Sequence, residues 1–173
     1  MVTTGTDRHP FGRLVDWMDE WCDSHPEAIV MMQRGASRQS RHGRCRELIP
    51  HAELCEIFTR ASAVVTHAGP STVMDARAAG RLPIVVPRDP RLREHVDGHQ
   101  LRFARHLARH RVAEVASAKE ELFALIDRAL SNPAEFAVIN NGDAIEGVQR
   151  FGSVADDLLN AAGWPASGSM ASF

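Results

Sequence analysis

Residues 62–100 read SAVVTHAGPSTVMDARAAGRLPIVVPRDPRLREHVDGHQ, and their pattern predicts one β-α-β unit. Strands are expected at 63–66 and 83–86, with a helix at 73–79 between them. A turn rich in Gly, Pro, Ser and Thr separates the first strand from the helix, and a polar loop follows the second strand. Ligands of open parallel sheets bind beyond the carboxyl ends of the strands, so both polar segments are expected at a binding edge.

The turn before the helix has the composition of an anion-binding site. Gly69 allows the backbone to approach a ligand closely, and Pro70 suits a first helical turn. Ser71 and Thr72 place hydroxyls beside helix amides that attract anions, so the turn predicts binding of a diphosphate. Asp75 follows one helical turn later, where its carboxylate suits ribose hydroxyls. The alternative is an ordinary helix cap followed by a surface acid.

The loop after the second strand combines hydrogen-bond donors and acceptors suited to sugar hydroxyls. It contains Pro87-Arg88 and then Glu94 to Gln100, and it continues into an amphipathic helix at 101–111. The loop also contains a His-x-Asp-x-His pattern, His95-Val96-Asp97-Gly98-His99, which is typical of some metal sites. Zinc sites usually draw on three or four ligands with supporting partners, and no further cluster follows at such spacing, so we expect no metal.

At these residues the sequence resembles the glycosyltransferase family 28 C-terminal domain, the nucleotide-sugar half of a GT-B enzyme. The resemblance covers about residues 2–115. Within this family, the sequence is similar to the short catalytic subunits of two-component bacterial polysaccharide glycosyltransferases and to the cytosolic subunit of the eukaryotic dolichol-linked UDP-GlcNAc transferase. It is also similar to the donor half of lipid II synthase. The segments that carry it are Val2 to Thr6 with Pro10-Phe11 and Arg13-Leu14, Gln33 to Gly35, His67 to Thr72 with Asp75, Pro83 to Arg88, and Glu94 to Gln100.

The resemblance implies an α/β fold, with a Rossmann-like parallel sheet flanked by helices in a single domain over 1–162. It also implies donor-binding positions along the carboxyl edge of that sheet. These positions are Thr4, Gly5, Thr6, Gln33, Gly35, Leu54, His67, Gly69, Pro70, Ser71, Thr72, Asp75, Arg88, Glu94, His95, Asp97, His99 and Gln100. Gln100 matches a glutamine that contacts donor sugar hydroxyls, and the helix start near Leu54 corresponds to a segment that holds uracil through backbone groups.

The function that the resemblance implies is inverting, metal-independent transfer of a hexose or N-acetylhexosamine from a UDP-sugar. The UDP-sugar is a substrate, and no cofactor is expected. Helix N-termini and donor groups would stabilise charge on the leaving diphosphate, with Arg88 and His67 as further candidates. The catalytic base is unknown, and His95 and Asp97 are its local candidates.

GT-B enzymes commonly take that base from an acceptor-binding domain, for which this chain is too short. We therefore expect a membrane-anchored partner subunit, a polyprenyl-diphosphate-linked saccharide acceptor, and a place at the inner face of the membrane. Two alternatives stay open: a non-catalytic UDP-sugar-binding or regulatory subunit, and a flavodoxin-like domain with unrelated chemistry.

Composition agrees with a cytoplasmic protein that does not bind nucleic acid. The net charge is −2, and no basic patch with interleaved aromatic residues occurs. Three cysteines lack metal or redox spacing, and no apolar run approaches the ~20 residues that cross a bilayer.

The flanking segments complete the expected topology. A strand is expected at 1–4 and a helix from Pro10, with Phe11, Leu14, Val15, Met18 and Trp21 on its buried face. Gly12 replaces an acid that short family members usually carry. Further strands are expected at 28–32, 47–49 and 112–115, and helices at 50–61, 118–130 and 154–161.

Two further expectations concern particular segments. The basic segment 34–46 is interpreted as a mobile, solvated loop, with attraction for anionic lipid headgroups, a lipid diphosphate acceptor or an acidic partner face as the alternative. In the helix at 118–130, Leu122, Ile126 and Leu130 are expected to be buried, and the tail 163–173 is expected to be disordered.

Overall fold

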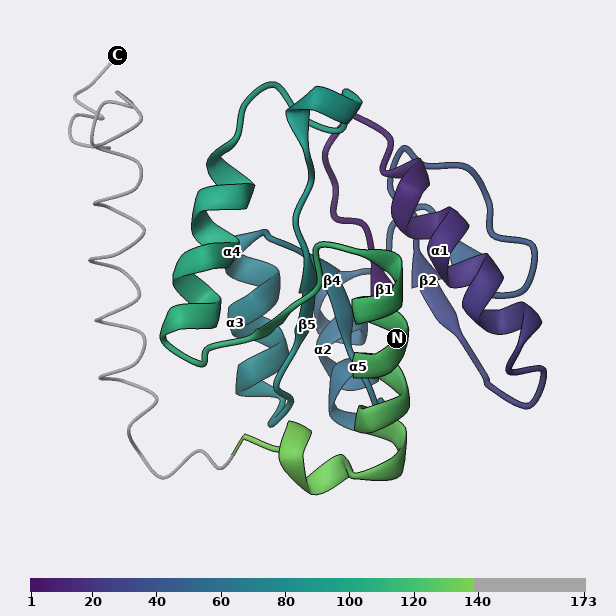
Figure 1. Ribbon diagram of the computed structural model, residues 1–173. Coiled ribbons are helices and arrows are strands. Elements are labelled where there is room, and N and C mark those ends of the chain that lie inside the picture. The colour runs from purple at the N-terminus through teal and green to yellow at the C-terminus, as the bar shows by residue number, and fades with distance from the viewer. Residues whose placement is uncertain (139–173) are drawn as a thin grey trace, which may run out of the picture. The chain divides into compact units, whose positions relative to one another are not determined.

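Six parallel strands form one sheet in the computed structural model, which describes residues 1–138 (Figure 1). The strands are β1 (Val2–Thr3), β2 (Met31–Gln33), β3 (Arg44–Arg46), β4 (Val65–His67), β5 (Ile84–Val86) and β6 (Glu114–Val115). Their spatial order is β3-β2-β1-β4-β5-β6, so the direction of sheet growth reverses between β1 and β4. This order is Rossmann-like and confirms the predicted fold class.

Helices cover both faces of the sheet (Figure 1). They are α1 (Gly12–Asp23), α2 (His51–Arg60), α3 (Pro70–Ala78), α4 (His99–Arg109) and α5 (Lys119–Ser131), with short 3₁₀ helices η1 (Pro90–Leu92) and η2 (Pro133–Phe136). On one face α1 and α5 pack against the strands in a shared apolar core. On the other face α2 and α3 build a second core. Each layer therefore buries one apolar stripe of its helices.

The apolar stripe of α1 follows the predicted pattern, whereas that of α5 is rotated slightly. Phe11, Leu14, Val15, Met18 and Trp21 are all buried. In α5 the buried positions are Leu122, Leu125, Ile126 and Ala129, and Leu130 is 43% exposed. The expectation that Leu130 is buried was wrong, because the stripe continues from Leu122 to Ala129, seven residues or two helical turns later.

The strand expected at 47–49 is absent, and β3 lies three residues earlier. Arg44 to Arg46 pair with β2, whereas Ile49 leads into α2 and packs in the second core. Apolar Leu48 and Ile49 suggested a buried strand. Because β3 is an edge strand, its arginines can reach solvent and the strand needs no apolar pattern.

The basic segment 34–46 is held against α1 and is not a freely solvated loop. Arg38 pairs with Asp16 and Asp19, and Arg41 pairs with Asp19 and Asp23. The Asp19 carboxylate is buried and accepts hydrogen bonds from the Ser40 hydroxyl at 2.5 Å and the Arg41 amide at 2.9 Å. Much of the positive charge of this segment is therefore neutralised within the protein.

The expected helix at 154–161, the domain limit at 162 and the tail at 163–173 lie outside the described residues. Within residues 1–138, no helix combines the length and apolar character that crossing a bilayer requires.

Replacing Asp19 tests whether this carboxylate fixes the basic segment. Asp19→Ala should lower the free energy of unfolding by about 3 kcal/mol, because buried donors lose their acceptor. Urea denaturation measures this loss. Asp16→Ala is the matched control, since Asp16 is exposed and shares Arg38, and it should cost no more than about 1 kcal/mol.

The same carboxylate predicts a pH dependence. Burial alone would raise the pKa of Asp19, but hydrogen bonds from Ser40, Arg38 and Arg41 outweigh it and lower the pKa. Its stabilising contribution is therefore complete above about pH 4 and is lost as the pH falls through the folded-state pKa. Equal costs for the two variants at neutral pH would contradict the assignment.

Candidate functional site

The carboxyl ends of β1 and β4 meet where the strand order reverses, and the predicted glycines converge there. A Cβ atom on Gly5 would lie 2.5 Å from His67 Cε1, and one on Gly69 would lie 2.2 Å from His67 Nε2. The backbone of Gly5 also has φ +83°, in the region that favours glycine. The His67 ring therefore lies between two main-chain segments that have no room for side chains.

His67 is an uncharged group at neutral pH. Burial, followed by the positive charge of Arg88, lowers its pKa to about 4. A neutral imidazole can donate one hydrogen bond and accept another. His67 can therefore hydrogen-bond a diphosphate at this edge, but it does not bring a positive charge to it.

The N-terminus of α3 opens at the same edge. Gly69 is its N-cap and Pro70 its first residue, and the first backbone bond of the helix runs from the Val73 amide to the Gly69 carbonyl. The amides of Ser71 and Thr72 precede that bond and have no acceptor within the helix. This arrangement can bind an anion, as the sequence predicts.

Asp75 lies on α3 at the side that faces α2. Its Oδ2 atom is 3.0 Å from His51 Nε2, and 26% of its side chain is exposed. Leu54, on α2, is buried in the second core. The Leu54 side chain is therefore a core residue, and a contact of its backbone with the base of a nucleotide stays a prediction.

Gln33 and Gly35 follow from β2, on the other side of β1. The Gln33 side chain is buried and donates to Thr3 Oγ1 at 3.1 Å, while its Oε1 accepts from the Ile49 amide at 2.9 Å. Gln33 therefore holds the segment that starts α2, and a direct contact with a donor stays a prediction. The Gly35 backbone lies beside the Gly5 carbonyl.

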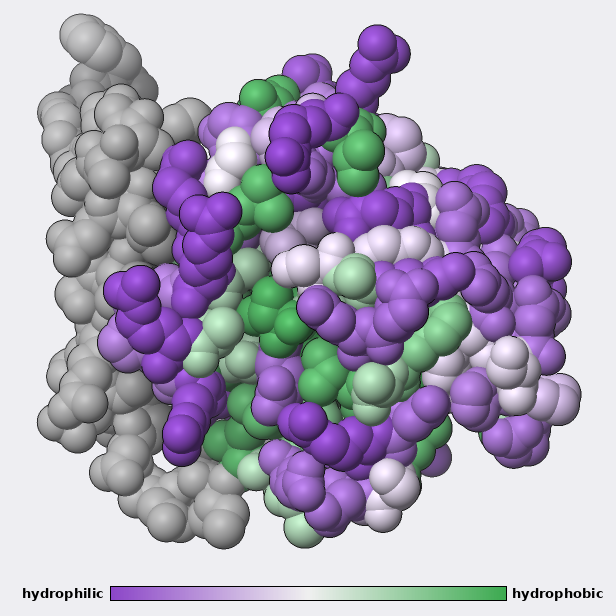
Figure 2. Space-filling view, viewed as in Figure 1, coloured by the Kyte–Doolittle hydropathy of each residue, from purple (hydrophilic) through white to green (hydrophobic). Residues whose placement is uncertain are grey.

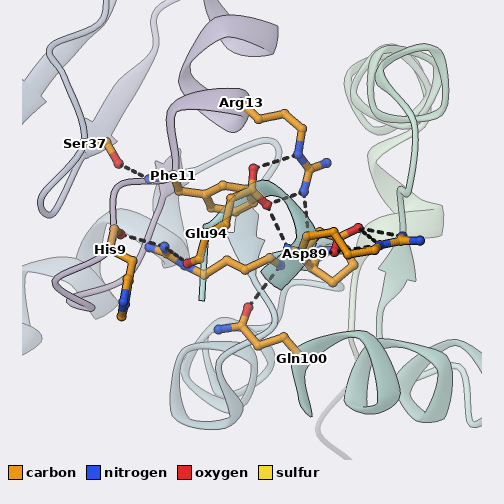
Figure 3. A network of polar contacts seen from close by, with 10 residues as sticks. His9, Phe11, Arg13, Ser37, Asp89, Glu94 and Gln100 are labelled. Carbon is orange, nitrogen blue, oxygen red and sulfur yellow. Dashed lines mark hydrogen bonds and ion pairs between the residues drawn. The ribbon is translucent and has the colours of Figure 1, made fainter. Parts of the chain in front are cut away.

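A polar network links His9, Glu94 and Gln100 (Figure 3), and at its centre lies the buried Arg88. Its guanidinium donates to the carbonyls of Thr4, His9 and Glu94 at 2.7, 2.7 and 2.8 Å. The ring of Phe11 lies under it, with 4.8 Å from Cζ to the ring centroid. The sequence predicts that Arg88 contacts the leaving diphosphate. In the structure its hydrogen-bond donors join two loops. A direct contact with a ligand stays a prediction.

Glu94 and Gln100 complete this network (Figure 3). The Glu94 carboxylate is buried, pairs with Arg13 at 2.8 Å and accepts from the Asp89 amide at 2.8 Å. Gln100 Oε1 accepts from the Arg88 amide at 3.2 Å. These side chains fix the loop between β5 and α4, which the sequence predicts to face the sugar.

Sequence reasoning gave no site role to Asp7, His9 or Arg13, although Arg13 is among the residues that carry the resemblance. Asp7 accepts from the His9 ring at 2.6 Å and lies 3.3 Å from His95 Nε2. The signal was present as a polar run directly after the first strand, but its partner His95 lies 88 residues later in the chain. Because Asp7 meets His95, the β1 and β5 loops are in contact at the predicted sugar-facing side.

The candidate base residues are already hydrogen-bonded within these loops. His95 has Asp7 at its Nε2 atom, and its Nδ1 accepts from the Asp97 amide at 3.5 Å. Asp97 Oδ1 lies 2.5 Å from His99 Nδ1. Their catalytic role stays a prediction, and the contacts observed position the loop.

A hollow lies beside the Arg88 network, where Arg13, Pro87 and Asp89 contribute to its wall. It has a volume of about 420 Å³ and lies between α1, α4 and β6, with Trp17, Leu92 and Leu101 in its wall. Figure 2 shows apolar side chains gathered in the middle of the face that carries α1 and α5, surrounded by hydrophilic ones. The predicted donor-binding residues do not line this hollow.

Comparison with protein families gives one match. The model of the glycosyltransferase family 28 C-terminal domain matches residues 22–152. The match includes Gln33 and the whole stretch from His67 to Gln100, and it begins after the turn at Thr4–Thr6. No characterised protein matches the chain at a significant level.

His67 should titrate far below an ordinary histidine. Because its folded-state pKa is about 4, the unfolded chain binds the proton more readily, and folding stability falls as the pH drops from about 6.5 towards 4. NMR of ring-labelled protein should show a neutral His67 down to pH 5. A titration midpoint near 6.5 would contradict the packing described.

Gly69→Ala should destabilise the protein by about 1–3 kcal/mol, because the new methyl group overlaps the His67 ring. The backbone of Gly69, with φ −96° and ψ 123°, accepts alanine without strain. In a His67→Ala background the cost should fall below about 0.5 kcal/mol. Urea denaturation of the four proteins gives the cycle, and equal costs in both backgrounds would place the clash elsewhere.

Proposed function

Because this chain belongs to the glycosyltransferase family 28 C-terminal domain, we propose that it binds a UDP-sugar and acts as the donor-binding, catalytic subunit of an inverting, metal-independent hexosyltransferase. The family assigns the coarser role of a glycosyltransferase donor domain with GT-B, Rossmann-like architecture. The nucleotide, the sugar and the partner are parts of the proposal.

One observation supports the proposal most strongly. The amino end of α3, the His67 ring and the Gly5 backbone meet at the point where the strand order reverses. Ligands of open α/β sheets bind at such a point, and a helix N-terminus there favours phosphate. The His67 ring packs against the buried backbone of Gly5 and Gly69, beside the exposed first residues of α3, Pro70 and Ser71, where a diphosphate would lie.

The chemistry follows from charge that develops during transfer. As the glycosidic bond to the diphosphate breaks, negative charge grows on the leaving group while the sugar becomes oxocarbenium-like. The α3 amides and the Ser71 and Thr72 hydroxyls would stabilise that charge by hydrogen bonds already in place. Arg88 adds a fixed positive charge beneath the loops, since its buried guanidinium stays protonated.

The ribose is proposed to bind at Asp75. Its carboxylate lies on α3 about one turn beyond the proposed phosphate position, and it is partly exposed. In the absence of ligand, His51 holds one of its oxygens. Binding of a ribose diol would therefore replace this contact with two hydroxyl donors.

The acceptor is proposed to bind to a different polypeptide. Residues 1–138 contain one sheet. The two candidate bases, His95 and Asp97, are already paired with Asp7 and His99 in the loops at its edge. We therefore assign the base and the polyprenyl-diphosphate-linked saccharide to a membrane-anchored subunit, which would place this chain at the inner face of the membrane.

The same observation favours a second candidate, a UDP-sugar-binding subunit without turnover. It predicts donor binding that equals that of the first candidate. The two differ in sugar transfer by the purified complex.

Calorimetric titration with UDP in the presence of EDTA tests the donor site. UDP should bind without metal, and Asp75→Asn should weaken binding about tenfold or more, since hydrogen bonds to a charged acceptor are lost. Glu56→Gln is the matched control, because Glu56 is an exposed acid on α2. UDP-GlcNAc, UDP-glucose and UDP-galactose then rank the sugars.

Two results would overturn the proposal. One is the absence of UDP binding at millimolar ligand, and the other is equal affinity of wild type and Asp75→Asn.

A further inference from the structure

Three possible metal ligands converge where α2 meets α3. His51 and Cys55 are four residues apart on α2, so they share one helical face, and Asp75 projects from α3 towards them. One ligand atom from each residue lies within 4.8 Å of the other two. Asp75 follows Cys55 by 20 residues, so the three ligands come together only through the packing of α2 against α3.

The distances fit a tetrahedral ion. Cys55 Sγ lies 3.6 Å from His51 Nε2, and His51 Nε2 lies 3.0 Å from Asp75 Oδ2. For Zn–S and Zn–N bonds of about 2.3 and 2.05 Å at a tetrahedral angle, sulfur and nitrogen would be about 3.6 Å apart. The corresponding nitrogen-to-oxygen separation is about 3.3 Å, which a small side-chain rotation reaches.

The chemistry of the three groups also fits a particular class of metal. Thiolate, imidazole and carboxylate together suit zinc and similar borderline cations rather than magnesium or calcium. The His51 side chain is 72% exposed, so an ion has access and water can occupy a fourth position. Burial and the charge of Asp75 raise the pKa of the Cys55 thiol, so metal binding would release its proton to solvent.

We propose that His51, Cys55 and Asp75 bind a zinc-type divalent cation, and that this ion competes with the nucleotide for the Asp75 carboxylate. The competition rests on the proposed function, in which Asp75 binds the ribose. The ion is an inhibitor in this scheme and takes no part in sugar transfer. Free zinc would thereby set the fraction of the protein that can bind donor.

A second group of ligands, His95, Asp97 and His99, provides an internal comparison. It contains no sulfur, and its members are hydrogen-bonded to one another and to Asp7. Cobalt(II) distinguishes the two clusters, because only thiolate ligation gives a sulfur-to-cobalt charge-transfer band.

The first experiment titrates cobalt(II) into the full chain, freed of metal and reduced with a phosphine. One ion per chain should bind, with a near-ultraviolet charge-transfer band and the intense visible bands of tetrahedral cobalt. Cys55→Ser should abolish the charge-transfer band, and His51→Ala should weaken binding by at least about tenfold. Cys45→Ser is the control, since Cys45 lies on β3 beside the Ser40 amide, and its spectrum should match wild type.

The second experiment measures UDP affinity at buffered free zinc. At ten times the zinc dissociation constant, the apparent dissociation constant for UDP should rise about tenfold, as simple competition requires. In Cys55→Ser the effect should disappear. UDP also binds zinc in solution, which lowers the concentration of free UDP. Because this lowering is the same for wild type and Cys55→Ser, the variant corrects for it.

The outcomes separate the metal site from the donor site. Absence of the charge-transfer band, or a band that persists in Cys55→Ser, overturns the metal site. Binding of both ligands without competition overturns the shared role of Asp75. If cobalt binds as described but UDP binds to no form of the protein, the proposed function fails and the metal site is supported.

Discussion

The carboxyl edge of the sheet depends on one buried cation. Arg88 is only 1% exposed, and burial of a charge is costly unless its donors are satisfied. The carbonyls of Thr4, His9 and Glu94 accept three hydrogen bonds from its two terminal nitrogens, whereas its Nε has no hydrogen-bond partner among the described residues. These carbonyls belong to the loops after β1 and β5. Since β4 lies between β1 and β5, the arginine joins the loops on either side of the β4 turn that leads into α3.

The same cation shapes the electrostatics around it. Its charge helps to keep the neighbouring His67 ring neutral, after the larger effect of burial. Glu94 provides a nearby negative charge and forms an ion pair with Arg13, which also donates a hydrogen bond to the Pro87 carbonyl. Asp7 is the second negative charge near Arg88, so two carboxylates accompany the two arginines at this edge, beside the amino end of α3 that can bind an anion.

Local patterns predicted the fold well, because strand, turn and helix signals are short-range. The β-α-β unit, the apolar face of α1 and the turn before α3 are all observed. Two failures involved partners distant in sequence. The β3 strand can be recognised only through its pairing with β2, and neutralisation of the basic segment only through Asp19 on α1. For the site, residue types pointed to the correct edge, but whether a polar side chain faces a ligand or holds a loop depends on contacts such as that of Gln33 with Ile49.

Arg88 holds the loops through their main-chain atoms, which leaves the side chains of Thr4 and His9 free for other roles. Its guanidinium binds main-chain oxygens at positions 4, 9 and 94, and every amino acid carries such an oxygen. Side chains at Thr4 and His9 can therefore change without removing an acceptor, provided that the backbone keeps its path. During divergence, the loops can acquire new recognition residues while the scaffold that holds them is inherited unchanged.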